Sequence, residues 1–187
     1  MTLPTVAEAR SLAQYLLEDA LPRRWSHVQA VGAKAERICR MLPSSDGSAL
    51  VVAAWLHDVG YSPTLVSTGF HSLDGARWLR DHGFDNRVTA LVAYHSCARL
   101  EAVERNLDAT LTDEFPREDS PTADALCYCD MTTGPDGQDF EAADRLAEIR
   151  SRYGPDHLVT RFITKAEPEI LAAVRRTKQR ISSLQPM

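Results

Sequence analysis

Six side chains of types that commonly bind metal ions occur within the first 130 residues: His27, His57, Asp58, His71, His95 and Asp130. His57 and Asp58 are adjacent and directly follow the apolar run 49–56. A buried helix ending in this pair must satisfy both polar groups, because each costs several kcal/mol if left alone. A bound cation satisfies an imidazole and a carboxylate together. The alternative is that the pair lies in solvent at the helix end.

The other candidate ligands lie on the apolar faces of the helices that carry them. His95 follows Val88 by seven residues and Asp130 follows Leu126 by four, so both share the inward stripe of a helix. His27 borders the apolar face of an earlier helix, and His71 directly precedes a later one. Three helices therefore direct a ligand-type side chain toward the core that residues 57–58 enter.

Helical periodicity dominates the chain and strict alternation is scarce, which predicts an all-α helical bundle. Helices are expected over about 5–19, 22–42, 48–59, 72–82, 86–97 and 122–132, with two or three more after residue 139 that break near Gly154-Pro155. The helix over 48–59 has scarcely a polar side, so we expect it at the centre of the bundle. The Ser-Ser-Asp-Gly stretch at 44–47 is expected to be a break, and residues 98–120 a charge-rich connection.

The length of 187 residues suits one domain that buries about 70% of its unfolded surface. We expect a single helical domain over 1–187, with a core over about 22–132 and C-terminal helices over 139–184 packed on it. No repeat or linker interrupts the chain.

Composition narrows the class of partner. The net charge of −5 and the interspersed signs argue against long nucleic acid and favour a small ligand. The longest apolar run is too short for a membrane helix, and the amino terminus lacks a signal pattern, so no membrane partner and a cytoplasmic location are expected. The four cysteines, at 39, 97, 127 and 129, form no disulfide framework and are interpreted as buried thiols in a reducing compartment. The oligomeric state is not predicted.

The order of these motifs resembles the H…HD…D signature of the HD-domain metal-dependent phosphohydrolase superfamily. The segments that carry the resemblance cover about 22–132: WSHVQAVGAKAERI, VAAWLHDVGY, HSLDGARWLRDHGF, VTALVAYHS and ALCYCDM. The last fifty residues add nothing specific. The resemblance implies one divalent ion (Fe, Mn, Co, Ni, Zn or Mg) held by His27, His57, Asp58 and Asp130.

His71 and His95 match positions that bind a second ion in a subset of this superfamily, bridged to the first by Asp58. The alternative is that both histidines orient or protonate the substrate beside a single ion. A metal lowers the pKa of bound water toward about 7, and two ions stabilise the charge on a reacting phosphate. Asp58, His71 and His95 are therefore the candidate catalytic residues.

Four residues are candidates for contact with the substrate. Arg24 and Arg99 lie about one turn from ligand positions and Arg77 within two turns, although solvated arginine is the alternative for each. Tyr61 stands where the cyclic-dinucleotide branch has a lysine after His-Asp-x-Gly, which argues against that substrate. The remaining histidines, at 82 and 157, are expected to have no role.

The leading hypothesis is a phosphohydrolase that acts on a small phosphate ester or anhydride, with a nucleotide as the expected substrate, by attack of metal-activated hydroxide on phosphorus. Two alternatives remain open. The six-residue pattern also resembles mixed-valent di-iron oxygenases such as myo-inositol oxygenase and organophosphonate oxygenases, and a non-catalytic nucleotide-sensing module is the third possibility.

Overall fold

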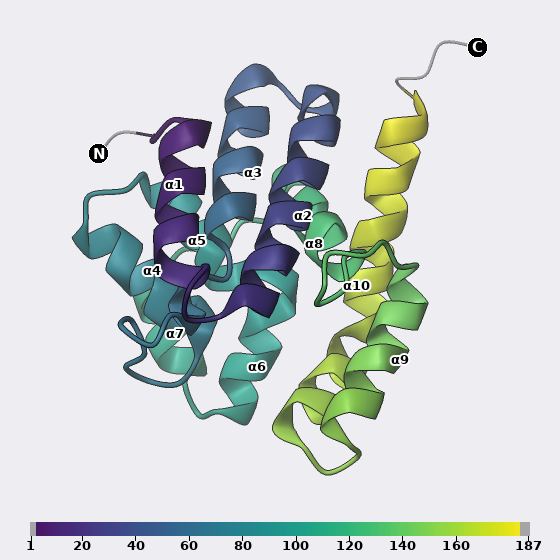
Figure 1. Ribbon diagram of the computed structural model, residues 1–187. Coiled ribbons are helices and arrows are strands. Elements are labelled where there is room, and N and C mark those ends of the chain that lie inside the picture. Colours follow the sequence, from purple (N-terminus) through teal and green to yellow (C-terminus); the bar gives the residue numbers. More distant parts are fainter. Residues whose placement is uncertain (1–2, 184–187) are drawn as a thin grey trace.

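The computed structural model describes residues 3–183, which form a helical bundle without a β-strand (Figure 1). The α-helices are α1 (Val6–Leu17), α2 (Pro22–Ile38), α3 (Ser44–Leu56), α4 (His71–Asp81), α5 (Asn86–Tyr94), α6 (Ala98–Glu104), α7 (Asp108–Glu114), α8 (Pro121–Met131), α9 (Ala142–Tyr153) and α10 (Leu158–Ser183). Three 3-10 turns, η1 (Cys39–Met41), η2 (Val59–Tyr61) and η3 (His95–Cys97), follow α2, α3 and α5. The predicted all-α class is confirmed.

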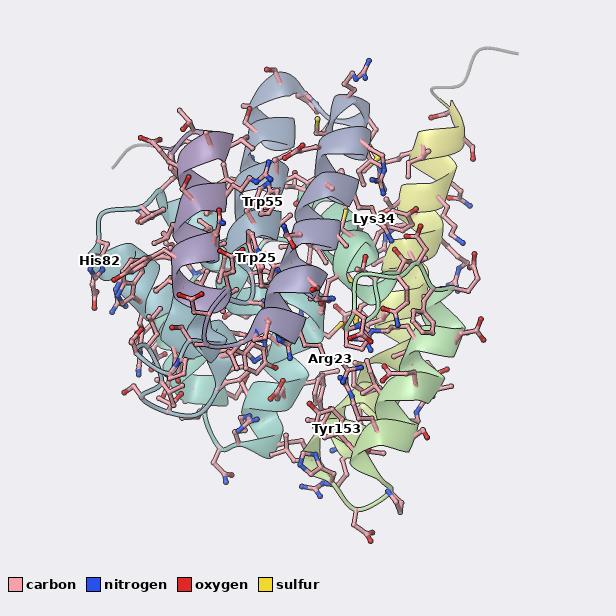
Figure 2. The ribbon with its side chains drawn as sticks, in the orientation of Figure 1. Arg23, Trp25, Lys34, Trp55, His82 and Tyr153 are labelled. Carbon is pink, nitrogen blue, oxygen red and sulfur yellow. The ribbon has the colours of Figure 1, made fainter. Side chains whose placement is uncertain are left out.

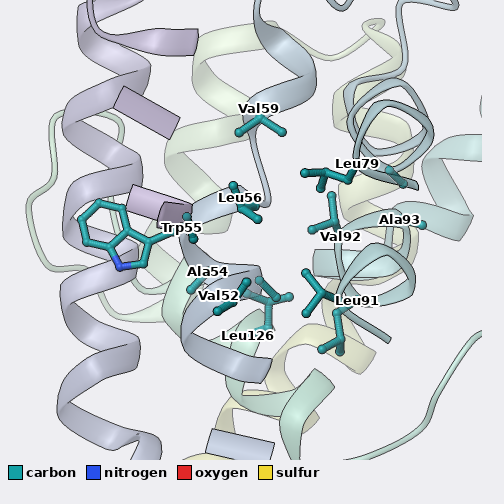
Figure 3. Packing of buried hydrophobic residues seen from close by; sticks show 14 of the residues in the cluster. Val52, Ala54, Trp55, Leu56, Val59, Leu79, Leu91, Val92, Ala93 and Leu126 are labelled. Atoms are coloured by element: carbon teal, nitrogen blue, oxygen red, sulfur yellow. The ribbon is translucent and has the colours of Figure 1, made fainter. Parts of the chain in front are cut away.

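Helix α3 lies at the centre of the bundle. It packs against α1, α2, α5 and α8, and every residue from 49 to 56 is buried. Figure 3 shows Val52 and Leu56 facing the side chains of Leu91, Val92 and Leu126 from α5 and α8. The expected central position is confirmed, and its cause is that α3 has no polar face to expose.

Helix α3 begins at Ser44, so the predicted break over 44–47 is wrong. These residues form its first turn, where Asp46 is favoured by the positive end of the helix dipole. Gly47 lets the turn approach η1, because a Cβ on it would lie 2.8 Å from the carbonyl oxygen of Cys39. A segment whose composition is typical of a loop therefore forms the start of a helix.

Two segments between residues 86 and 120 also differ from the prediction. The expected connection over 98–120 contains α6 and α7, which are only seven residues each and too short to show a clear period. Helix α5 ends at Tyr94, because Ser96 and Cys97 adopt left-handed backbone angles with φ of 48° and 63°. Such angles cost about 1–3 kcal/mol each and are typical of functional sites.

The predicted break near Gly154-Pro155 is confirmed, since α9 ends at Tyr153 and α10 begins at Leu158. Figure 1 shows both helices on the opposite side of the bundle from α1. They bury an apolar cluster against α8, formed by Cys127, Met131, Leu146, Ile149, Phe162, Ile163, Ala166, Ile170 and Ala173. The single-domain organisation stays a prediction.

Two expectations from composition concern cysteines and membranes. All four cysteines are free thiols, and the predicted burial is confirmed for Cys127 and Cys129 but is wrong for Cys39 and Cys97, which are partly exposed. Within residues 3–183, no helix combines the length and apolar character needed to cross a membrane.

Gly60 allows the turn after α3 to contact α4. A Cβ on Gly60 would lie 1.9 Å from the carbonyl oxygen of His71 and 2.6 Å from the backbone nitrogen of Gly75. Neither backbone atom can move without displacing α4. The glycine therefore brings the Asp58 turn and His71 together.

We predict that Gly60→Ala lowers the free energy of unfolding by about 3 kcal/mol, at the upper end of the usual cost of overpacking. Gly69→Ala is the matched control. Its Cβ would meet nothing within 4 Å, but its φ of 74° costs about 1–2 kcal/mol for an alanine. Urea denaturation measures both variants. Equal losses of stability would show that the contact between Gly60 and α4 is not tight.

Candidate metal centre

The six candidate ligands come from four helices and two turns and converge at one end of α3. His57 is the C-cap of α3 and Asp58 opens η2, and both are almost completely buried at 0% and 2% exposure. The four others come from α2, α8, the start of α4 and η3. They form two groups, each with ligand atoms within 4.8 Å of one another: His27, His57 and Asp130, and Asp58, His71 and His95.

The first group is centred on a carboxylate oxygen of Asp130. Its Oδ1 lies 3.1 Å from Nε2 of His27 and 4.0 Å from Nε2 of His57. Three nitrogen and oxygen donors at this spacing suit a borderline or hard divalent ion and leave positions open for water and substrate.

The second group is centred on Oδ1 of Asp58. This oxygen lies 3.5 Å from Nε2 of His71 and 3.8 Å from Nε2 of His95, and the two imidazole nitrogens are 3.2 Å apart. His95 enters the group because η3 turns away from α5 at this residue.

Asp58 also contacts the first group through its other carboxylate oxygen. Oδ2 lies 3.3 Å from Nε2 of His57 and 3.8 Å from Nε2 of His27. One carboxylate thus presents an oxygen to each group of ligands. This arrangement can bridge two ions.

The outer nitrogens of three histidines are fixed by backbone carbonyls. Nδ1 of His27, His57 and His95 lies 3.0, 2.8 and 2.6 Å from the carbonyl oxygens of Gly134, Ala54 and Val92. Because a carbonyl only accepts, Nδ1 carries a proton, and Nε2 is the inward nitrogen that can bind a metal ion once it is itself deprotonated.

Nε2 of His57 provides a direct test of fit for a metal. It is buried and has no hydrogen-bond partner among the described residues. Buried polar atoms are normally satisfied, so an orphan of this kind requires an explanation such as an ion. The residues fit a divalent cation.

The electrostatics of the site also favour a cation. Burial opposes ionisation of Asp58, but Arg24 and His57 outweigh it and hold the pKa of this carboxyl well below its ordinary value. Burial likewise opposes ionisation of Asp130, and His27 and His57 lower its pKa. Both carboxylates are therefore charged at neutral pH.

The histidines respond to these charges in two ways. Burial alone would lower the pKa of His57, yet Asp58 and Asp130 raise it to about 9. Burial lowers the pKa of His71 well below its ordinary value, and burial together with His57 lowers that of His95. The negative charges that keep a proton on a fully buried imidazole also attract a metal ion. The ion takes the place of that proton when it binds.

Arg24 and Tyr61 flank the second group. The Arg24 guanidinium donates from Nη1 to Oδ2 of Asp58 at 2.7 Å and lies 4.0 Å above the ring of Tyr61. Tyr61 in turn stacks on the imidazole of His71 at 4.0 Å and 14°. This stack holds the arginine and the histidine in fixed positions beside the candidate ligands.

A cavity of about 200 Å³ opens on four of the candidate ligands, Asp58, His71, His95 and Asp130, and includes Arg24 and Tyr61 in its wall. The other two candidate arginines do not line it. Arg77 pairs with Glu114, while Arg99 pairs with Asp108 and borders a neighbouring groove that also contains His95 and Ser96. Their distance in sequence from the motifs did not predict where these long side chains point, and neither lines the cavity that holds Asp58.

Several residues that line the cavity were missed from the sequence. Ser96 donates a hydrogen bond from Oγ to Oδ2 of Asp130, and its left-handed backbone carries no sequence signal. The outer wall comes from α9, α10 and the turn between them, and includes Arg145, Arg152, Tyr153 and His157. No role was expected for His157. Figure 2 shows Tyr153 near the end of α9, on the side toward α6.

The comparison with protein families identifies the class. The family model for the HD domain matches residues 24–133, which is more than half of the chain, and the chain therefore belongs to the HD domain family. The match spans the candidate ligands but ends before α9 and α10. No curated protein and no solved structure matches the chain in the corresponding searches.

We predict that the protein, purified without a chelating column, binds about two divalent ions and that Asp58→Ala binds none, because each group loses one oxygen of the carboxylate that they share. His95→Ala is expected to retain about one ion, since only the second group loses a ligand. Inductively coupled plasma mass spectrometry measures the metal content.

His82→Ala is the matched control, because His82 is exposed and stacks on Trp78 instead of facing the site. It should bind as much metal as the wild type. Unchanged metal content in Asp58→Ala would contradict the assignment of this residue.

Proposed function

We propose that the protein is a metal-dependent phosphohydrolase that acts on a small phosphate ester or anhydride. Its ions are held by His27, His57 and Asp130 and by His71 and His95, with Asp58 between them. The observation that carries the proposal is the Asp58 carboxylate, which presents one oxygen to each group of ligands. HD domains are commonly metal-dependent phosphohydrolases, which supports the same reaction class.

Bound divalent ions supply hydroxide at neutral pH and offset the charge that develops on a reacting phosphate. The protein's own residues bind and orient the phosphate. Arg24 uses Nη1 for Asp58 and has further guanidinium donors for phosphate oxygens. Burial raises the pKa of Tyr61, so its phenol stays a neutral hydrogen-bond donor beside Arg24.

The volume of the cavity bears on the size of the part of the substrate that it encloses. Its volume of about 200 Å³ is below the range of about 300–1,000 Å³ that is typical of pockets for drug-sized ligands. This volume favours a compact phosphate ester over a larger substrate that the cavity would have to enclose completely. A nucleotide stays a prediction and would need its base outside the cavity.

The reaction class is tested with the metal-loaded protein and a panel of sugar phosphates, phosphorylated organic acids and nucleotides. We expect phosphate release that a chelator abolishes and added metal restores. Asp130→Ala should reduce kcat/KM at least about 100-fold, because a first-group ligand is lost. Asp136→Ala is the control, since this exposed carboxylate pairs with Arg23 outside the site, and its activity should be unchanged.

Oxygen uptake is measured in the same reactions with iron-loaded protein, because the nitrogen and oxygen ligand set also suits a di-iron oxygenase. Phosphate release without oxygen consumption is the expected result. Oxygen-dependent turnover with no hydrolysis in any metal form would contradict the proposal.

A further inference from the structure

The cavity wall opposite the candidate ligands is built by residues that lie beyond the HD match. Arg145 and Arg152 extend from α9, and His157 directly precedes α10. These residues share the cavity with Asp58 and His71, so a molecule bound at the ions can also reach this wall.

Arg145 is an unusual residue because its charge is buried. It is 5% exposed, its Nη1 donates to Glu148, and its Nε is buried without a hydrogen-bond partner among the described residues. Fully buried arginine is rare unless it is well paired. Glu148 thus pairs with one edge of the Arg145 guanidinium, and the edge that carries Nε has no acceptor within residues 3–183.

Arg152 shares the same carboxylate. Its Nε lies 3.5 Å from Oε1 of Glu148, at the far limit of a hydrogen bond. Its guanidinium lies 4.9 Å over the ring of Tyr153, which stacks on His157 at 4.7 Å. Two guanidinium groups thus share one carboxylate, and Glu148 itself does not line the cavity.

The other charges around the cavity are already matched. Its wall contains four arginines and three carboxylates: Arg24, Arg105, Arg145 and Arg152 with Asp58, Glu101 and Asp130. Glu101 accepts hydrogen bonds from Arg105, and Asp58 and Asp130 belong to the candidate metal centre. The unmatched positive charge therefore lies at Arg145 and Arg152.

We propose that Arg145 and Arg152 form an anion subsite, and that the substrate is a compact phosphate ester carrying a second anionic group. The phosphate lies at the ions and the second group, a carboxylate or another phosphate, lies against the two guanidinium groups. The cavity of about 200 Å³ favours a molecule whose two acidic groups are close together. The inference rests on the proposed function for the identity of the group at the ions.

The subsite is tested by calorimetric titration of protein loaded with Zn²⁺, which has no redox chemistry. The probes are 3-phosphonopropionate and propylphosphonate, two non-hydrolysable molecules of similar length that differ in the carboxylate. We expect the carboxylate-bearing probe to bind at least about 10-fold more tightly, because its carboxylate accepts charge-assisted hydrogen bonds from the guanidinium groups. Arg145→Gln and Arg152→Gln should each reduce this ratio of affinities toward one.

Glu148→Gln provides a test in the opposite direction. The substitution removes the negative charge that competes with the probe's carboxylate for both arginines. The affinity for 3-phosphonopropionate relative to propylphosphonate should therefore rise. A merely structural defect would not raise it. Arg150→Gln is the matched control, since Arg150 lies on the same helix, pairs with Glu167 and does not line the cavity. Its ratio should equal that of the wild type.

Equal affinity for the two probes in the wild type, or a lower ratio in Glu148→Gln, would overturn the subsite. If Arg145→Gln does not fold, the affinity ratios of Arg152→Gln and Glu148→Gln still test the subsite. Phosphate release from 2-phosphoglycolate and ethyl phosphate is measured alongside. Hydrolysis of both esters at equal kcat/KM contradicts the subsite alone, whereas a preserved affinity ratio without any hydrolysis supports the subsite and contradicts only the proposed function.

Discussion

The structure depends on one buried carboxylate. Asp58 is 2% exposed and lies at the end of the most buried helix of the bundle, where an unpaired charge would cost several kcal/mol. Arg24 compensates part of this charge at 2.7 Å, and the imidazoles of four histidines direct Nε2 toward its two oxygens. The surrounding helices are arranged to bring these groups together, and the cation that we propose completes the balance of charge.

The positions of the candidate ligands could be predicted from the sequence because periodicity fixes the face of a helix. Asp130 and the apolar run before His57 indicated an inward direction before any contact was known. The boundaries of α3 and α5 could not be predicted in the same way. Ser44 begins a helix in a loop-like composition, and the left-handed turn at Ser96 depends on a hydrogen bond to Asp130, far away in the sequence.

Arg24 lines the cavity as expected, whereas the other two candidate arginines do not, for a different physical reason. A long side chain pairs with whichever carboxylate the fold brings near, and Arg77 and Arg99 found Glu114 and Asp108 outside the cavity. Arg145 is buried although its helix is amphipathic and unremarkable in sequence. The HD match ends before this helix, so the residues that we propose to select the substrate lie outside the part of the chain that defines the family.

The central claim is that one carboxylate bridges two ions, and anomalous diffraction from crystals soaked in Mn²⁺ tests it directly. We expect two anomalous peaks about 3.5–4 Å apart on either side of Asp58, the usual separation of paired catalytic ions. One should contact His27, His57 and Asp130, and the other His71 and His95. A single peak at the first group, with His71 and His95 too far away to bind it, would contradict the bridging role of Asp58.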